Sequence, residues 1–282
     1  MIKTYSHDHQ ISSGQVLDCK LIINECIGRE IFRLHFLWPG PAPKAGQFFM
    51  IKPFRSSVYL GRPVSVAHYN QTINNLQFLI ARRGRGTSDI VKMYPGEYAQ
   101  LMGPLGNAWT DFIKPVPKDM HTGEKPIALA GGGIGIAPLE ALYSEFSNHH
   151  IDFYAGFKTA FTDTSDKSVD CPLAVGHKLS QKEKNRIIVA TEDGSEGKKG
   201  LITDFLDIQK YSCICACGPQ PMLKKIADDC KAAGVPCFVS LERYMACGAG
   251  ACLGCTVTTR NENRRCCADG PIFPAEDLIF DE

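Results

Sequence analysis

The chain has 282 residues, a formal net charge of +1, and 44% hydrophobic and 22% charged residues. This length is typical of two or three domains of ~100–150 residues each, and such a chain can bury a core without disulfides. Its charge attracts neither nucleic acid nor an acidic membrane. No apolar run approaches the ~20 residues of a membrane helix, and residues 1–10 lack the apolar core of a signal peptide. We therefore expect a cytoplasmic protein without a nucleic-acid or membrane partner.

The first part of the chain is predicted to be an antiparallel β-barrel spanning residues 1–113. β-Branched and aromatic residues recur in short runs that are separated by glycines, which is the pattern of small barrels. A polar, proline-rich stretch at 114–125 then has the composition of a linker. The predicted strands are Val16–Ile23, Ile31–Phe36, Gln47–Lys52, Pro63–Tyr69 and Asn75–Ala81, and a helix-like segment covers Ser88–Met93.

The second part, residues 114–239, is predicted to be an α/β domain. Apolar runs alternate with helix-like segments, which indicates a parallel sheet covered on both faces. The expected strands are Pro126–Ala130, Ile151–Ala155, Arg186–Ala190 and Ser212–Ala216, and the expected helices are Ala137–Phe146, Leu201–Ile208 and Pro221–Ala233. The remaining residues, 240–282, are rich in cysteine and glycine and too irregular for either architecture. The fold class is therefore multidomain, with a small third domain at the C-terminal end.

The third part contains a cysteine motif. Cys247, Cys252 and Cys255 have C-x4-C-x2-C spacing, and Cys266 and Cys267 follow. In a reducing compartment such a cluster indicates metal binding, and this spacing is that of plant-type [2Fe–2S] ligation. The intervening glycines and alanines would let the backbone curl and bring its N–H groups to the sulfurs. A zinc site is the alternative. Spacing leaves the fourth ligand open between the two adjacent cysteines.

Most other cysteines have a simpler interpretation. Cys213, Cys215 and Cys217 alternate along a predicted strand, which would place them on one face of it as small buried residues. Three ligands spread along a strand are too far apart for one cluster. The same interpretation applies to Cys19, Cys26, Cys171, Cys230 and Cys237.

Four further segments indicate bound phosphates. In 61–65 Arg62 could bind a phosphate bidentately, although a plain strand end is equally compatible. The basic, glycine-rich segment 82–88 offers amides and hydroxyls, with a solvated turn as the alternative. The loop 131–138 follows a buried strand and opens a helix, and 217–222 repeats that arrangement, as nucleotide-binding loops do. The strict G-x-G-x-x-G motif is absent from the first of these loops.

Taken in order, these motifs resemble the ferredoxin-reductase-like flavoproteins, and more closely the electron-transfer subunits of dihydroorotate dehydrogenase B. The resemblance extends over nearly the whole chain. It is carried by 62–65, 86–87, 103–106, 131–138, 217–219 and 242–247, and by the closing Cys267–Phe273 segment. That last segment resembles the family's C-x-D-G-P motif, whose cysteine is the fourth ligand, which selects Cys267.

The resemblance implies roles for individual residues. FAD would contact Arg62, Pro63, Val64 and Ser65, and also Leu79, Ile80 and Ala81 through their backbone, with its pyrophosphate at Gly86 and Thr87. The nicotinamide nucleotide would bind at Gly132, Gly133, Gly135, Pro138, Cys217, Gly218 and Pro219. The [2Fe–2S] cluster would bind to Cys247, Cys252, Cys255 and Cys267. No arginine cluster awaits a 2′-phosphate, which favours NADH over NADPH, and no role is assigned to 158–184.

The implied function is an electron relay from NADH through FAD and the cluster to a separate FMN-containing catalytic subunit of pyrimidine biosynthesis. No acid–base side chain is expected, because the cofactors carry the chemistry. Two rivals remain. A diaphorase subunit of another redox complex, such as an NADPH:ferredoxin oxidoreductase, a sulfide dehydrogenase or a hydrogenase, would have the same cofactors. A zinc-stabilised binding module would have none of them.

Overall fold

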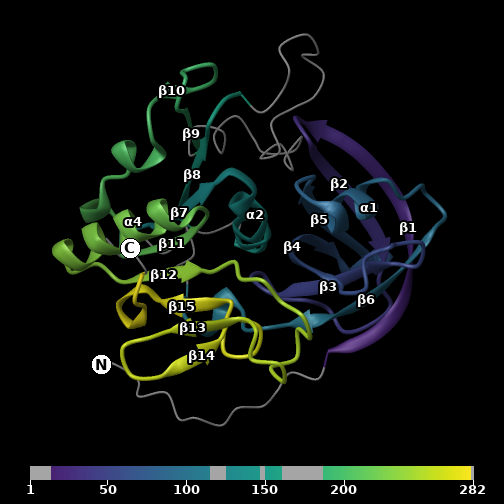
Figure 1. The fold of residues 1–282 in the computed structure, drawn as a ribbon. Helices are drawn as coiled ribbons and strands as arrows, with labels where there is room; N and C mark the ends of the chain where they lie inside the picture. The colour runs from purple at the N-terminus through teal and green to yellow at the C-terminus, as the bar shows by residue number, and fades with distance from the viewer. Residues whose placement is uncertain (1–13, 115–124, 147–149, 161–186, 281–282) are drawn as a thin grey trace.

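The computed structural model describes residues 14–114, 125–146, 150–160 and 187–280. A closed barrel lies beside an open sheet flanked by helices, and the C-terminal segment lies below both (Figure 1). Most of the expected linker at 114–125, and the stretch 161–186 that includes Cys171, fall outside the described residues.

The barrel is antiparallel, with strand order β1-β2-β5-β4-β3-β6. Alternation along each strand sends one set of side chains inward. Trp38, Phe49 and Phe78 meet there edge to face, with centroids 4.8 and 5.7 Å apart. All five strands expected in the barrel are confirmed. The sixth strand, β6, was not predicted, and helix α1 begins three residues before the expected position. The bounds are β1 Gln15–Gly28, β2 Ile31–Leu37, β3 Phe48–Pro53, β4 Arg62–Asn70, β5 Asn75–Ala81, α1 Arg85–Val91 and β6 Tyr98–Leu105.

The second sheet has the order β10-β9-β8-β7-β11-β12-β15, and its strands are parallel except for β15. Helices α2 and α4 pack into different cores with alternate residues of β11, which confirms a parallel sheet covered on both faces. The bounds are β7 Ile127–Gly132, α2 Ile136–Glu145, β8 Ile151–Phe157, β9 Ile187–Thr191, β10 Lys198–Lys199, β11 Cys213–Cys217, α4 Gln220–Ala233 and β12 Cys237–Ser240.

One expected helix is wrong. The segment 201–208 forms two short 3-10 turns, Ile202–Phe205 and Ile208–Lys210, with an extended Leu206 between them. The carboxylate of Asp204 accepts the backbone N–H of Leu201 at 3.2 Å. Aspartate favours such local caps over helix interiors, and here it closes a single turn instead of continuing a helix.

The C-terminal segment is more ordered than its composition indicates. It contains the hairpin β13 (Thr256–Thr258) and β14 (Asn263–Arg265), and then β15 (Ile272–Pro274). Strand β15 pairs antiparallel with β12, so residues beyond 240 complete the sheet of the α/β part. The division into 1–113, 114–239 and 240–282 stays a prediction.

The alternating cysteines of β11 occupy the place expected for them. Cys213, Cys215 and Cys217 are buried in one core, while Ile214 and Ala216 face the other. Cys19, Cys230 and Cys237 are buried as well. The prediction for Cys26 is wrong, because this thiol is exposed beside an irregularity in the pairing of β1 with β2.

Candidate functional site

The four expected ligand cysteines lie in one curled segment and in the turn that packs on it. They fall into two pairs in which the backbone N–H of one cysteine points at the sulfur of the other: that of Cys252 at Cys247 Sγ, and that of Cys267 at Cys255 Sγ. Within the described ranges, no three His, Cys, Asp or Glu side chains are arranged to hold a single metal ion. Two thiol pairs match the needs of a cluster with two irons, each of which takes two protein sulfurs.

Backbone N–H groups surround these sulfurs. The amides of Ala249 and Cys252 lie 3.4 and 3.5 Å from Cys247 Sγ. The amide of Gly250 donates to Cys267 Sγ at 3.2 Å, and that of Cys267 to Cys255 Sγ at 3.4 Å. The curl that aims them depends on left-handed backbone at Gly248, Gly250 and Leu253. Donors of this kind stabilise anionic sulfur, so the donor set fits the group that the spacing predicts.

The amides also change the acidity of the thiols. Burial raises the pKa of Cys247, but hydrogen bonds from the amides of Cys252 and Ala249 outweigh it and lower the value to about 7. Burial, and after it the hydrogen bond with the Cys255 thiol, together raise the pKa of Cys267 to about 12. Cys247 is therefore more easily converted to thiolate than the buried Cys267.

Cys266 is directed away from the other thiols. Its Sγ donates to the carbonyl of Leu241 at 3.3 Å, and its side chain is fully buried. Burial raises the pKa of this thiol well above its ordinary value. The geometry therefore places Cys267, and not Cys266, beside Cys255 and the amide of Gly250 in the curled segment.

The cysteine segment lies directly on the barrel. A Cβ on Gly248 would come within 2.7 Å of Met50 and 2.9 Å of Met102. Met50 is on β3, opposite Pro63 of β4. The segment thus contacts a residue that is the cross-strand neighbour of the expected flavin-binding run.

Two polar residues fix this arrangement. Asn107 follows β6; its side chain donates to the carbonyls of Asp269 and Ile272 and accepts the N–H of Ile272. Arg265 forms an ion pair with Asp269 at 3.1 Å and donates to the carbonyl of Gly250 at 3.2 Å. The turn that carries Cys267 is therefore tied both to the barrel and to the other ligand cysteines.

The expected FAD residues come together at one end of the barrel. The guanidinium of Arg62 lies so close to Gly86 that a Cβ there would come within 2.1 Å of Nε. Thr87 accepts the amides of Arg83 and Gly84 through Oγ1, which orders the start of α1. Leu79 and Ile80 are buried, so contact with a ligand through their backbone stays a prediction.

The two expected nucleotide loops pack against each other. A Cβ on Gly135 would come within 2.5 Å of the carbonyl oxygen of Cys217, and one on Gly132 within 2.7 Å of Pro219. Strands β7 and β11 are neighbours, so both loops leave the same edge of the sheet. Glycine is required here for contact between the loops, in addition to any approach of a phosphate.

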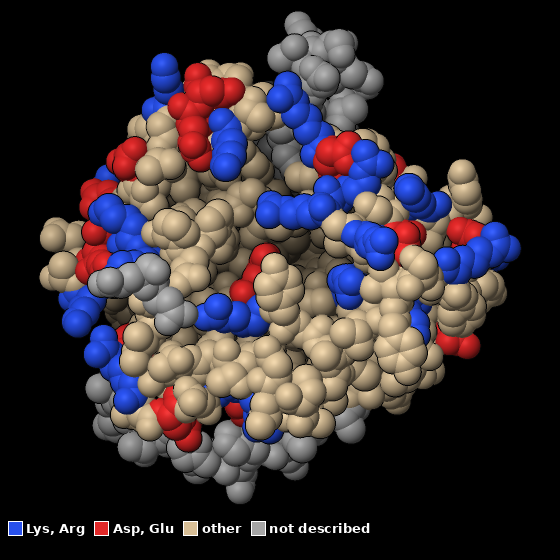
Figure 2. Space-filling view, viewed as in Figure 1, with Lys and Arg blue, Asp and Glu red and all other residues tan. Residues whose placement is uncertain are grey.

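These loops form one wall of a cavity of about 820 Å³ between the sheet and the barrel. The cavity crosses the carboxyl ends of β11, β7, β8 and β9, where open α/β sheets bind ligands. Figure 2 shows it as a hollow with basic side chains at its rim and acidic ones inside. The charged residues that line it are Arg29, Arg83, Lys158, Lys225, Glu192, Asp204 and Glu242.

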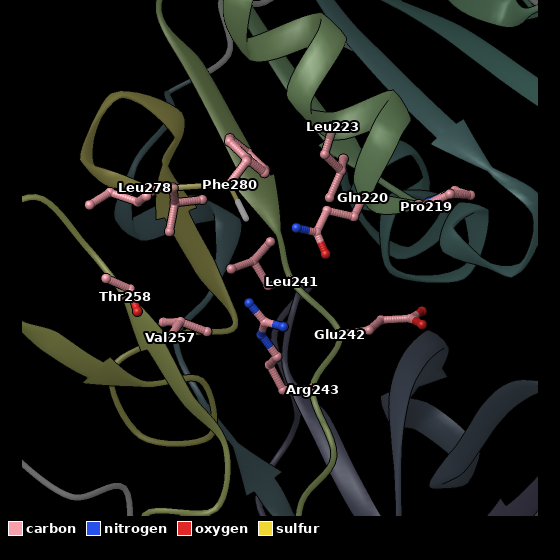
Figure 3. A pocket seen from close by; sticks show the side chains of 12 residues that line it. Pro219, Gln220, Leu223, Leu241, Glu242, Arg243, Val257, Thr258, Leu278 and Phe280 are labelled. Atoms are coloured by element: carbon pink, nitrogen blue, oxygen red, sulfur yellow. The ribbon is translucent and has the colours of Figure 1, made fainter. Parts of the chain in front are cut away.

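A smaller cavity of about 200 Å³ adjoins the large one and shares Gly218, Pro219 and Glu242 with it. Glu242 and Arg243 point to opposite sides of the chain that leads from β12 to the cysteines (Figure 3). The carboxylate of Glu242 opens into the large cavity. Enclosure by the surrounding protein raises its pKa, and the charge of Arg83 partly opposes that shift.

The cavity contains some of the expected nucleotide residues and others that no motif indicated. Gly132, Gly133, Gly135, Gly218 and Pro219 line it. Pro138 and Cys217 do not, because Pro138 lies under Trp109, whose Nε1 donates to its carbonyl, and Cys217 faces the core. Arg62–Ser65 are not among its lining residues either. The charged lining residues come from separate segments of the chain. The sequence pointed to two of them: Arg83 lies in the basic run at 82–88, and Glu242 lies in the motif at 242–247.

A solved structure of NADH-dependent reduced ferredoxin–NADP oxidoreductase superimposes with a TM-score of 0.72 at 23% identity, covering 93% of this chain and 90% of that chain. This likeness shows the fold, which is that of the ferredoxin reductases. Residues 242–279 match the iron–sulfur cluster binding domain of dihydroorotate dehydrogenase B. Among the described residues, no helix is long and apolar enough to cross a membrane.

Curated relatives identify the family. The electron transfer subunit of dihydroorotate dehydrogenase B (NAD⁺) from Clostridium perfringens is 35% identical over 242 residues, covering 84% of this chain and 87% of the relative. That of Clostridium acetobutylicum is 35% identical over 239 residues, covering 85% and 87%. The chain belongs to the family of dihydroorotate dehydrogenase B electron transfer subunits, and the resemblance predicted from its motifs is confirmed.

Proposed function

We propose that the chain passes electrons between NAD(H), FAD and a [2Fe–2S] cluster, and onward to an FMN-containing dihydroorotate dehydrogenase catalytic subunit in cytoplasmic pyrimidine biosynthesis. The relatives' names support the electron-transfer role and the use of NAD⁺. "Subunit" in those names implies a partner that contributes the catalytic site. FAD and NAD(H) would supply hydride transfer, and the cluster would supply one-electron transfer.

The observation that carries the proposal is the contact of the cysteine segment with the barrel. Gly248 lies on Met50, and Met50 lies opposite Pro63 in the expected flavin-binding run. The nucleotide loops meet the same barrel through β5, which contacts the turn Gly133–Gly135. One barrel thus adjoins both the nucleotide loops and the thiols, as a relay requires.

The chain's own residues would act by binding and positioning. Arg62, beside Gly86, would bind a phosphate of FAD, and Pro63, Val64 and Ser65 would line its ring. Gly132–Gly135, Gly218 and Pro219 would hold the nicotinamide nucleotide in the cavity. Cys247 and Cys252 would bind one iron, and Cys255 and Cys267 the other.

Anaerobic purification tests the proposal. The expected result is a coloured protein with about one FAD and two irons per chain, which co-purifies with an FMN-containing subunit. Flavin-free protein without iron after reconstitution would reject it, and zinc in place of iron would favour the binding module. Co-purification with a large iron–sulfur flavoprotein would instead favour a diaphorase subunit, because that role needs the same cofactors and a different acceptor.

A further inference from the structure

A buried carboxyl group lies where the α/β part meets the barrel. Glu140 is in the second turn of α2, and only 3% of its surface is exposed. Within the described part of the chain, neither carboxyl oxygen has a hydrogen-bond partner. A buried carboxyl group without a partner is uncommon, because its desolvation is costly.

Most of the side chains around α2 and Glu140 are apolar. Helix α2 lies between the sheet and the barrel (Figure 1), and every residue of Ile136–Leu142 is buried. The barrel contributes Ile27, Ala67 and Leu79 to the same core. This core joins the barrel, where FAD is expected, to the α/β part, where the nucleotide is expected. Glu140 is the charged residue that α2 places in this core.

The charged and titratable groups around α2 do not neutralise this carboxyl group. Arg33 on β2 is the cation whose charge acts on this carboxyl group; its Nη1 binds Glu25 at 3.4 Å, and its buried Nε has no hydrogen-bond partner among the described residues. His35 is hydrogen-bonded to Asn75 at 3.1 Å, and burial lowers the pKa of this imidazole and of His68 on β4. From the sheet, β11 presents the thiols of Cys213, Cys215 and Cys217, and the α2-facing side chains of β7 and β8 are uncharged.

We propose that Glu140 is a positioning residue for hydride transfer, and that its neutral, protonated side chain keeps α2 docked on the barrel. An ionised carboxylate at this place would either draw water into the contact or pull Arg33 away from Glu25. Burial raises the pKa of Glu140 well above its ordinary value, and Arg33 only partly opposes this.

The position of α2 on the barrel matters because this helix contacts both the expected nucleotide site and the expected flavin site. Helix α2 continues directly from the loop Gly133–Gly135, and it packs on β4, which carries Arg62–Ser65. Arg33 lies opposite Leu79, a predicted flavin contact. A shift of α2 would therefore move the nucleotide loop relative to the flavin strand. This step rests on the proposed function, whereas the protonation of Glu140 does not.

Thermal unfolding of the purified wild type and of Glu140→Gln, each with whatever cofactor it retains, tests the protonation; far-UV circular dichroism measures it from pH 5 to 8.5. A carboxyl group whose folded pKa is raised makes the wild type lose stability as pH rises above the unfolded value of ~4.3, by up to about tenfold in the unfolding constant per pH unit. The variant should thus unfold at a higher temperature than the wild type, by a margin that grows with pH. Glu145→Gln, at the exposed end of the same helix, should follow the wild type. A Glu140→Gln midpoint at or below that of the wild type at neutral pH, as an ion pair with Arg33 requires, would overturn the proposal.

Stopped-flow reduction of bound FAD by saturating NADH tests the positioning. The wild-type rate should fall at alkaline pH, while that of Glu140→Gln stays constant. An equal fall in both proteins would overturn the positioning role. Protein that binds no FAD would overturn the proposed function, and with it the positioning role, but the unfolding data would still decide the state of Glu140.

Discussion

Two regions of the molecule each carry three cysteines within a short stretch and differ in almost everything else. In β11, three alternating thiols point into an apolar core, and burial raises the pKa of Cys215 and Cys217 well above the ordinary value. In the 247–255 segment the backbone curls, and amides lower the pKa of Cys247 to about 7. The difference shows that the path of the backbone decides whether a cysteine is a buried core thiol or one surrounded by amide donors, as a predicted metal ligand should be.

The largest effect is expected from Cys252→Ser, because one iron would lose a ligand. Cluster content should collapse, and electron transfer to an acceptor should fall by more than the ~10–100-fold that loss of a ligand's hydrogen-bond partner costs. Iron analysis and visible absorption measure it. Cys215→Ala, which also removes one cysteine, should keep the cluster and cost only ~1 kcal/mol of packing. Equal iron loss in Cys252→Ser and Cys215→Ala would contradict the distinction between the 247–255 segment and β11.

Thiol alkylation of the iron-depleted chain should separate the two regions chemically. The thiolate is the reactive form, so at pH 7.5 Cys247 should react at least ~100-fold faster than Cys215. Because the pKa of Cys247 is lowered to about 7, its rate should rise from pH 6 to 8 and then level off. Mass spectrometry of labelled peptides gives both rates, and similar values would contradict the assigned environments.

Gly248→Ala should disturb the curl itself. Gly248 has φ +68, and an added Cβ would lie 2.7 Å from Met50 Cγ. Left-handed backbone costs a non-glycine residue ~1–3 kcal/mol, and the clash adds to this. We expect less iron per chain and a lower unfolding midpoint. Gly254→Ala is the matched control, since its φ is not left-handed and its nearest neighbour would be 3.6 Å away.

The smallest effect is expected at Cys266, which lies next to the predicted ligand Cys267 in sequence but resembles the β11 thiols in its environment. Cys266→Ser should retain the cluster, because a hydroxyl can still donate to the carbonyl of Leu241, and should cost ~1 kcal/mol. Cys267→Ser should lose the cluster. Electron paramagnetic resonance of the reduced proteins measures the cluster. Loss of its signal in Cys266→Ser and retention in Cys267→Ser would make Cys266 the fourth ligand and Cys267 the core residue.

Sequence was informative wherever the determining contacts are local. Alternation in β11 predicted the buried side of each thiol, and the spacing of Cys247, Cys252 and Cys255 predicted their convergence. The choice of Cys267 required the family resemblance, and the structure supplies its physical reason in the hydrogen bond from Cys266 to Leu241.

Features built by distant segments could not be predicted. Position 135 is glycine because a side chain there would collide with the carbonyl oxygen of Cys217 on the neighbouring strand β11. No periodic pattern in the sequence reveals that contact. Arg29, Lys225 and Glu242 reach one cavity from three separate elements. The buried Glu140 interrupts the apolar side chains of α2, and the sequence pattern of that helix does not indicate that the barrel covers this face.

The pairing of β15 with β12 has a consequence for how this chain can vary. Ser240 and Ile272 are cross-strand neighbours, so everything between them begins and ends at the same point on the rim of one sheet. Excision is tolerated where the removed backbone is exposed and makes few contacts, and 241–271 does not meet that condition. A short turn in its place would keep β12 and β15 paired, but it would also take Glu242 out of the large cavity and Cys255, Val257 and Cys266 out of the core, so the cysteine-bearing segment is built into the reductase fold.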